Sequence, residues 1–591
     1  MVNDFSIQVA TANGSGSQSS NSVLLRALFG MGIPVSGKNL FPSNIAGLPT
    51  WYTVRVSRDG WVARKRESDL LVAMNPETAA EDVAALEPGA AVVFDAPLGL
   101  EKLRDDLVWY PVAFDAVVAP VTAEPKLRKL LRNMATVGVV ARLLGVELAE
   151  VERAIAKQFG GKAKARELNV AAARAGHARA ATLEKRDRLR VERMDGTTGK
   201  IMVDGNAAAA YGALFAGVTV VAWYPITPSS SLVETLIALL RRHRVGADGK
   251  ATFAVVQAED ELAAIGMAVG AGWAGARAMT ASSGPGISLM SEFAGLAYYA
   301  EIPAVIFDVQ RVGPSTGLPT RTQQGDVLST AVLSHGDTRH VLLFPGSVEE
   351  CFTMAIDAFD LAERLQAPVF VLSDLDLGMN VWMAEPFVYP ARPLDRGKVL
   401  SKEDLDRLGG FSRYADVDGD GIGWRTLPGT PHPRAAYFTR GTGHDEAAVY
   451  SERPEIYARN MARLARKLDT ARAALPAPVA DGAGAAVGIL CHGSTQFAVA
   501  ESRAQLRAEA GLETDLLRVR AYPFAAAVRA FVEAHPRVYV VEQNRDGQLA
   551  ALLRMDLPPE LAPRLRSVAI SDGLPLDARS VTDRIRAGEG S

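Results

Sequence analysis

Between residues 200 and 390 the chain alternates regularly between short apolar runs and helical segments. The runs have the length and β-branched content of strands: Val218–Trp223, Thr252–Val256, Ala276–Ala281 and Ala304–Val309. The segment 340–378 closes the region with another strand–helix–strand pattern. Because strands that alternate with helices form parallel sheets covered on both faces, the region is predicted to be a doubly wound α/β domain.

The same pattern recurs on both sides of this region, and 591 residues are too many for a single core. The N-terminal part has strand-like runs at 5–11, Thr53–Val56, Leu70–Ala73 and Ala91–Phe94, and a helical stretch from Ala123. The predicted fold class is therefore α/β with several doubly wound domains. The predicted divisions are 1–195, 196–390, an irregular connection over 391–475, and 476–591. The basic, alanine-rich stretch 161–194 is expected to be a solvated helical connector.

Composition argues against several classes of function. The net charge of -3 gives no reason to expect a general role on nucleic acid or on membrane surfaces. The apolar runs are too short to span a membrane, and the N-terminus lacks the basic and apolar regions of a signal peptide. Cys351 and Cys491 are far apart and cannot by themselves hold an iron–sulfur cluster or zinc. The expected compartment is the cytoplasm.

The segment WYPITPSSSLVETL, Trp223–Leu236, has two interpretations. It can simply begin a helix, since Thr227 or a following serine can cap it and Ser231 with Glu234 fits a capping box. It can also border a binding site, because ligands of open parallel sheets bind just past the carboxyl ends of the strands. Thr227 stands at such an end and is a candidate contact.

Two further motifs follow strands of the same predicted sheet. Glu259, Asp260 and Glu261 precede a helix of small apolar residues. The helix dipole alone can account for acids in a first turn. However, the small side chains permit close packing, so at least one carboxylate is expected in a buried site, where it can exchange a proton with a ring nitrogen. The glycine-rich turn TASSGPG, Thr280–Gly286, follows the next strand.

Arg311 follows the apolar strand Ala304–Val309, and Thr320, Arg321 and Gln324 lie in the loop after it. An arginine at a strand end can bind a carboxylate through two parallel hydrogen bonds. A surface arginine without a ligand is the alternative.

Three other features leave both a functional and a structural interpretation open. Gly14 and Gly16 follow the first strand and suit either a phosphate or a tight turn. The spacing in Asp416–Asp420 resembles the start of a calcium loop, but Leu427 replaces the closing glutamate, so a metal-free turn competes with a structural cation. His444 is either a catalytic group or a partner of a backbone carbonyl.

Taken together, these motifs resemble one family. The segments YPITPSS, EDELAAIGMAVGAGWAGARAMTASSGPG and RVGPSTGLPTRTQQGD are similar to the α subunit of 2-oxoacid:ferredoxin oxidoreductases. GSGSQSSNSVLLRALFGMGIPVSGKNLFPSN resembles their γ subunit, fused here ahead of α, and VYVVEQNRDGQLAALLR resembles their transketolase C-terminal-like domain. The resemblance covers nearly the whole chain, and this γ–α order is most similar to the 2-oxoglutarate enzymes. It implies a transketolase-like pyrimidine-binding core for thiamine diphosphate between a γ-type and a transketolase-C-like domain.

The resemblance also implies roles for individual residues. Glu261 corresponds to the glutamate that hydrogen-bonds N1′ of the thiamine aminopyrimidine and activates the cofactor. Thr227 and Arg311 correspond to catalytic substrate contacts, with Arg311 on a carboxylate and Thr320 assisting. The implied cofactor-binding residues are Tyr224, Pro225, Ile226, Glu261, Ser283 and Gly284.

Part of the family's pattern is missing. Gly419-Asp420-Gly421 is not followed by the paired asparagines that hold Mg²⁺ and pyrophosphate, and the cluster cysteines are absent, so no metal site is expected in this chain. The resemblance implies that a smaller β subunit supplies Mg²⁺ and a [4Fe–4S] cluster, in a heterodimer or heterotetramer. Coenzyme A would take up the acyl group and ferredoxin the electrons. Pyruvate, branched-chain or aryl 2-oxoacids are alternative substrates. A non-catalytic scaffold subunit or a self-sufficient decarboxylase are alternative functions.

Overall fold

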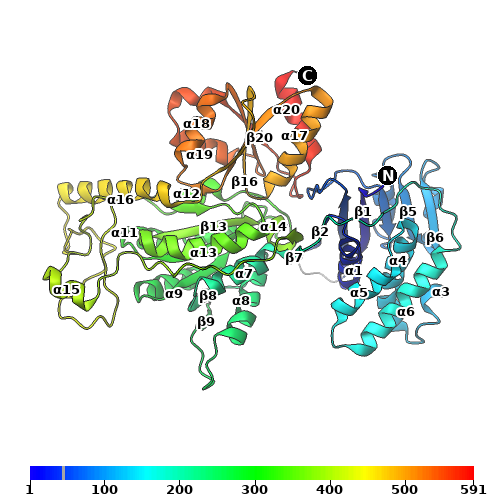
Figure 1. Ribbon diagram of the computed structural model, residues 1–591, viewed down its shortest axis with the longest axis horizontal. Coiled ribbons are helices and arrows are strands. Elements are labelled where there is room, and N and C mark those ends of the chain that lie inside the picture. Colours follow the sequence, from blue (N-terminus) through cyan, green and yellow to red (C-terminus); the bar gives the residue numbers. More distant parts are fainter. Residues whose placement is uncertain (43–46, 591) are drawn as a thin grey trace.

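The computed structural model describes residues 1–42 and 47–590, arranged around three sheets (Figure 1). Residues 43 and 44, which end the N-terminal glycine-loop motif, lie outside the described residues. Figure 1 shows the N-terminal unit in blue and cyan at one end, the central sheet in green, and the C-terminal unit in orange and red packed beside it. The predicted α/β class with several doubly wound units is confirmed.

The first sheet has the strand order β6-β5-β4-β1-β3-β2-β14-β7. Its N-terminal strands are β1 Asp4–Ala12, β2 Val35–Leu40, β3 Pro49–Ser57, β4 Leu70–Ala73, β5 Ala91–Asp95 and β6 Val108–Val112. The helices of this unit are α1 Ser17–Gly30, α2 Ala79–Ala84, α3 Phe114–Val118, α4 Pro125–Leu144, α5 Leu148–Phe159 and α6 Ala163–Ala180. The last two strands, β14 Val381–Ala384 and β7 Ile201–Asp204, come from the segment 196–390 and pair antiparallel. The N-terminal sheet is thus completed by the central part of the chain.

The stretch 161–194 was predicted to be a solvated helical connector. It does form a helix, α6, but this helix packs against α4 and is not fully solvated. Its basic residues face solvent, whereas Ala172, Ala173 and Gly176 are buried. A Cβ at Gly176 would lie 2.0 Å from the backbone oxygen of Ala135, and one at Gly138 would lie 2.0 Å from that of Ala173. The small residues of this alanine-rich stretch therefore allow the backbones of α4 and α6 to touch.

This contact predicts a stability effect. Gly176→Ala is expected to lower the free energy of unfolding by about 1–3 kcal/mol, because the added methyl group must push two backbones apart. Chemical denaturation followed by circular dichroism measures the effect. Gly161→Ala is the matched control, since nothing lies within 4 Å of a Cβ placed there. Equal stability of the two variants would contradict the proposed helix contact.

The central sheet has the order β18-β12-β13-β11-β10-β8-β9 and is parallel except for β18. Its strands are β8 Val220–Trp223, β9 Ala254–Gln257, β10 Ala278–Ser282, β11 Ala304–Gln310, β12 Val341–Leu343, β13 Pro368–Asp374 and β18 Ala521–Tyr522. One face is covered by α7 Gly205–Phe215, α8 Ser230–His243 and α13 Val348–Leu365. The other is covered by α9 Glu261–Trp273, α10 Gly284–Leu289, α11 Ser291–Tyr299 and α12 Val327–Ala331. This confirms the predicted parallel sheet with helices on both faces.

The prediction that the segment 391–475 is an irregular connection is wrong in part. The segment contains α15 Lys402–Leu408 and the long helix α16 Pro454–Ala474. The inward face of α16 carries mainly polar residues, so the sequence lacks the helical repeat of apolar residues that would have predicted this helix. Arg463 and Lys467 are buried there and bind the fully buried Glu301, with Arg463 Nη2 at 2.5 Å and Lys467 Nζ at 2.9 Å from its carboxylate oxygens. An ionic cluster, rather than an apolar face, anchors this helix.

The C-terminal sheet has the order β15-β17-β16-β19-β20. Its strands are β15 Val479–Asp481, β16 Val487–His492, β17 Thr514–Val519, β19 Arg537–Glu542 and β20 Leu565–Ala569. Its helices are α17 Gln496–Ala510, α18 Ala526–Ala534, α19 Gln548–Asp556 and α20 Ala578–Glu589. Residues of α18 and α19 share one apolar core with α9–α12, so the C-terminal and central units are packed as one body. No helix in the described part of the chain is long and apolar enough to cross a membrane.

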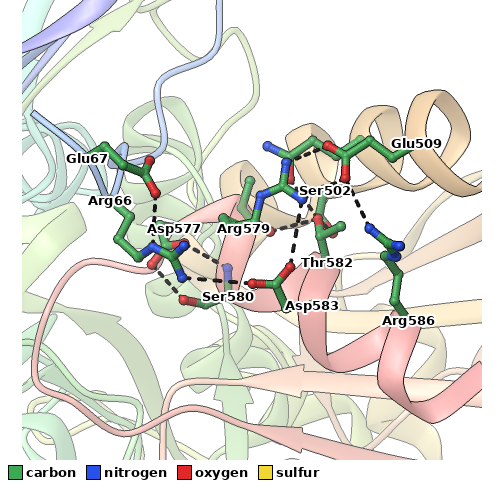
Figure 2. Close-up of polar contacts among 12 residues, drawn as sticks. Arg66, Glu67, Ser502, Glu509, Asp577, Arg579, Ser580, Thr582, Asp583 and Arg586 are labelled. Carbon is green, nitrogen blue, oxygen red and sulfur yellow. Dashed lines mark hydrogen bonds and ion pairs between the residues drawn. The ribbon is translucent and has the colours of Figure 1, made fainter. Parts of the chain in front are cut away.

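The N-terminal and C-terminal units also contact each other directly. Arg55 Nη2 lies 3.0 Å from Glu501 Oε1 with both side chains buried, and Ala63 is part of the C-terminal core. Figure 2 shows the polar rim of this contact, where Arg66 reaches Asp583 of α20 at 3.8 Å. The Arg66–Asp583 pair is solvent-exposed and adds little stability. The contact is fixed by the buried Arg55–Glu501 pair, by Ala63, and by Arg64, whose Nη2 lies 3.2 Å from Oδ2 of the buried Asp577.

Candidate active site

The site is built where β8, β10 and β11 end side by side in the central sheet. Each strand is followed by one of the motifs singled out in the sequence: the segment 224–229, the turn 283–286 and the loop 311–326. Since the carboxyl ends of parallel strands share one edge, the fold brings the three motifs together. The sheet order β11-β10-β8 thus places three motifs that are distant in sequence next to one another.

Thr227 and Arg311 meet through the backbone. Arg311 is buried, and its Nη1 donates to the carbonyl oxygen of Thr227 at 2.7 Å, while its Nη2 donates to that of Thr316 at 3.2 Å. Its Nε is buried without a hydrogen-bond partner among the described residues. Carbonyl oxygens therefore orient the guanidinium without neutralising it, and N–H groups remain to bind an anion.

The start of α8 differs from the predicted capping pattern. The helix begins at Ser230, after an N-cap residue, Ser229, whose side chain caps no backbone N–H group. The capping box predicted for Ser231 and Glu234 is wrong, because the Ser231 hydroxyl accepts a hydrogen bond from Asn206 Nδ2 at 2.8 Å. The Ser229 and Ser230 hydroxyls both donate to the carbonyl of Ile226, which holds the turn closed.

Glu261 is the buried member of its acidic triplet. Asp260 caps α9, because its Oδ1 accepts from Ala263 N at 2.7 Å, and Glu259 is exposed. Glu261 is only 6 % exposed, and a Cβ at Gly286 would come within 2.6 Å of its Cγ. No described residue donates a hydrogen bond to its carboxylate, and its charge acts on the guanidinium of Arg311. The glycine turn after β10 is needed for this close approach.

The polar atoms around Glu261 fit a bound heterocyclic cofactor. Thr280 lies in the middle of β10 and Ser283 directly follows the strand, and the hydroxyl oxygens of both are buried without a hydrogen-bond partner among the described residues. A buried polar atom without a partner costs free energy unless a ligand or water satisfies it. Together with the unpaired carboxylate of Glu261, they supply both donors and an acceptor, as an aminopyrimidine ring requires.

A cleft of about 730 Å³ opens at the same sheet edge. Of the predicted site residues, Gly284 and Arg311 line it. Its lining also includes residues that the sequence did not reveal as part of the site, namely Gln323, Asp326, Asn544, Arg545, Asp546 and Gln548. Four of these belong to the C-terminal unit, whose nearby Gln543 donates its backbone N–H to Gln324. The C-terminal unit therefore forms a wall of the site.

The other predicted residues lie around this centre. Tyr224 is 38 % exposed and Pro225 is also exposed, at the rim. Thr320 is buried, but its Oγ1 accepts from Arg321 Nη1 at 3.1 Å. Arg321 in turn donates to the carbonyl of Phe41 in the N-terminal unit. The loop 311–326 thus contacts both neighbouring units.

Three weaker features lie elsewhere. Gly14 and Gly16 have φ of 80° and 84° and border a separate cleft of about 500 Å³. Asp416, Asp418 and Asp420 pair with Arg466 and Lys398, and the described residues contain no group of three or more His, Cys, Asp or Glu placed to hold a metal ion. The His444 ring bonds the carbonyl of Thr442 through Nδ1 at 2.8 Å.

Two family models match the chain. Residues 211–382 match "Pyruvate flavodoxin/ferredoxin oxidoreductase, thiamine diP-bdg", and residues 6–179 match "Pyruvate ferredoxin/flavodoxin oxidoreductase". The match over residues 6–179 falls on the first sheet and the match over residues 211–382 on the central sheet. The three strand-end motifs of the candidate active site lie within residues 211–382.

Sequence relatives extend the likeness over almost the whole chain. The α subunit of 2-oxoacid:ferredoxin oxidoreductase 2 from Aeropyrum pernix is 32% identical over 93% of this chain and 93% of its own. The 2-oxoglutarate synthase subunit KorA from Methanocaldococcus jannaschii is 33% identical over 58% of this chain and 88% of its own. The chain is an oxidoreductase subunit of the thiamine-diphosphate class, and it belongs to the 2-oxoacid:ferredoxin oxidoreductase family. Within that family it aligns with α subunits, here with the γ part fused ahead.

A solved structure resembles the chain throughout. It is the 2-oxoglutarate:ferredoxin oxidoreductase from Magnetococcus marinus with 2-oxoglutarate, coenzyme A and succinyl-CoA bound. The TM-score is 0.89 at 29% identity, and the match covers 99% of each chain. The arrangement of all three units is therefore shared.

Proposed function

We propose that this chain is the catalytic α-type subunit of an enzyme that oxidatively decarboxylates 2-oxoglutarate, with coenzyme A as acyl acceptor and ferredoxin as electron acceptor, or that runs the reverse carboxylation. The observation that carries the proposal is the buried, unpaired Glu261 carboxylate beside Arg311 at one sheet edge. The full-length likeness to a 2-oxoglutarate enzyme supports the choice of substrate. Succinyl-CoA and CO₂ are the products of the oxidative direction.

The chain's own residues would contribute binding, orientation and proton transfer. Thiamine diphosphate, when bound, supplies the electron sink for loss of CO₂. Glu261 would hold a proton shared with N1′ of the aminopyrimidine, and the hydroxyls of Thr280 and Ser283 would satisfy polar atoms of the ring. Arg311 would bind the substrate carboxylate through its remaining N–H groups, while the backbone of Thr227 keeps the guanidinium in place. Tyr224, Pro225, Ile226 and Gly284 would border the cofactor, and Thr320 would support the substrate loop.

A smaller β subunit would complete the site and hold Mg²⁺ and a [4Fe–4S] cluster. The surface beside Glu261 suits such a partner, since β9 is the edge strand of the central sheet and α9 presents apolar residues to solvent. Val256, Leu262 and Met267 are 39%, 41% and 44% exposed. Exposed apolar side chains grouped around an edge strand are typical of a protein interface. One or two such pairs would form the working assembly, and the cytoplasm remains the compartment predicted from the sequence.

Gly270 tests this interface. It is exposed on α9, and nothing lies within 4 Å of a Cβ placed there, so Gly270→Trp should leave the chain folded. The indole would block close approach of the partner and weaken the complex about 10- to 100-fold, as measured by calorimetry with the purified β subunit. Gly161→Trp, on the N-terminal unit, is the control. Unchanged affinity in Gly270→Trp would place the partner on another surface.

The decisive test of the proposed function is anaerobic viologen reduction by the chain purified with its smaller partner, with coenzyme A and a panel of 2-oxoacids. A preference for 2-oxoglutarate supports the proposal. A preference for pyruvate, branched-chain or aryl 2-oxoacids would keep the chemistry and change the substrate. No reduction with any 2-oxoacid, in a complex that holds thiamine diphosphate and an intact cluster, would overturn it in favour of a scaffold subunit.

A further inference from the structure

Two carboxyl groups next to the candidate site have no role in the reaction proposed above. Asp308 lies near the carboxyl end of β11 and is completely buried, and neither of its carboxyl oxygens has a hydrogen-bond partner within the described part of the chain. Asp326 ends the loop that begins at Arg311, and its Oδ2 is also buried with no hydrogen-bond partner in residues 1–42 and 47–590. The same loop thus starts with the candidate substrate arginine and ends with an unsatisfied acid.

Asp308 of β11 pairs in register with Ser282 of β10, two residues before Gly284, and a Cβ at Gly284 would meet the Asp326 carboxylate. The two carboxyl groups therefore lie close together, and each acts on the other electrostatically. An ionised carboxylate can only accept hydrogen bonds, so two ionised groups here would leave buried oxygens facing one another without a donor. One proton removes the conflict, because it turns the contact into a hydrogen bond. Burial, and then the charge of Asp326, raise the pKa of Asp308 well above its usual value. Burial raises the pKa of Asp326 to about 6, although Arg311 opposes the shift.

The pair lies where its charge can reach the substrate. Asp326 lines the cleft, and its carboxylate would lie 3.0 Å from a Cβ at Gly284. Its backbone N–H donates to Gln310 Oε1 at 3.0 Å, which fixes the end of the loop to β11. The charged groups that act on this part of the site are Arg311, which attracts Asp326, and Glu261, which acts on Arg311. Arg311 is therefore shared between a protein acid and an incoming carboxylate.

We propose that Asp308 and Asp326 share one proton and that this keeps Arg311 available for the carboxylate of the 2-oxoacid, a positioning role that rests on the proposed function. While the proton is present, the pair carries at most one negative charge. When the proton is lost, Asp308 and Asp326 are both negatively charged. The added negative charge then competes with the substrate carboxylate for Arg311. The pair thus couples substrate affinity to proton concentration without touching the reacting atoms.

The first experiment examines the proton itself and does not depend on turnover. Infrared difference spectra between the wild-type complex and Asp308→Asn at pH 7 are expected to lose the carbonyl stretch of one protonated carboxyl group. Asp326→Asn, the second variant if Asp308→Asn does not fold, should instead shift the frequency of the same band, because the buried Asp308 carboxyl stays protonated and loses its acidic partner. Asp337→Asn, at an exposed position, should leave the band unchanged. A spectrum without a protonated carboxyl band at this pair would overturn the proposal even if the enzyme is active.

The second experiment examines the coupling. In the wild-type complex, KM for the 2-oxoacid is expected to rise with pH, by up to about tenfold per unit once the shared proton is lost, while kcat changes little. Asp308→Asn keeps a donor toward Asp326 and cannot titrate, so its KM should be nearly independent of pH. A KM profile in Asp308→Asn that still follows the wild type would overturn the positioning role. An inactive complex that retains the infrared band would instead count against the proposed function.

Discussion

Glu261→Gln is expected to lower kcat by about 10²–10⁴-fold, the usual contribution of a general acid–base group. Glutamine keeps the size of the side chain and can still form hydrogen bonds, but it cannot take up and release a proton. Because Glu261 has no hydrogen-bond partner among the described residues, its replacement breaks no contact of the fold. Thermal stability and assembly with the β subunit should therefore stay unchanged. Anaerobic viologen reduction with 2-oxoglutarate and coenzyme A measures the loss.

Glu259→Gln is the matched control for this change. Glu259 belongs to the same acidic triplet, is exposed and lies two residues away, so its replacement should leave kcat within about twofold, as expected of a surface substitution away from the site. Equal losses of kcat in both variants would show that the negative charge of the triplet matters and not the position of Glu261. Full activity in Glu261→Gln would remove the carboxylate from the mechanism and favour the scaffold alternative.

Glu301→Gln is expected to destabilise the protein by about 3–5 kcal/mol, because it leaves the buried charges of Arg463 and Lys467 without their counter-ion. Urea denaturation followed by tryptophan fluorescence measures the effect. Asp469→Asn on the same helix is the control, since Asp469 is 73 % exposed and its pair with Arg472 contributes little. A stable Glu301→Gln variant would mean that α16 is held by something other than this ionic cluster.

The same cluster predicts a dependence on pH. Burial alone would raise the pKa of Glu301, but the charges of Lys467 and Arg463 override burial and hold that pKa well below its usual value of 4.5. A carboxyl whose pKa is lower in the folded than in the unfolded protein stabilises the fold above the unfolded pKa. The stability difference between wild type and Glu301→Gln should therefore be full at neutral pH. It should shrink as the pH falls below 4.5.

Local pattern was sufficient for most strands of the central and N-terminal sheets. The run Leu70–Ala73 is β4 itself, because four apolar residues between polar ones can be buried on both faces of a parallel sheet. Helix α16 could not be found in this way, since its buried face is made of Asn460, Arg463 and Lys467 as well as Leu464. Their burial depends on Glu301, which is distant in sequence, and periodicity carries no information about such a partner.

The candidate site shows the same division. Sequence position alone placed Thr227 and Arg311 at strand ends, and the parallel sheet brings them together. Their actual contact uses the backbone carbonyl of Thr227, which no side chain encodes. The wall formed by Asn544 and its neighbours was missed because it depends on how the C-terminal unit packs on the central one. Asp326 was overlooked because an acid in a loop has no distinguishing mark until its burial is known.

The completion of the first sheet by β14 sets an order of events during synthesis. Gly37 of β2 pairs with Val381 of β14, so roughly 340 residues must be made before the edge of β2 is covered. At about 5–20 residues per second, the ribosome needs roughly 17–70 s for this. During that time the finished N-terminal core presents an open strand edge, which invites pairing with other nascent chains. The edge of β2 in the N-terminal sheet is therefore exposed to other chains until the central part of the same chain emerges.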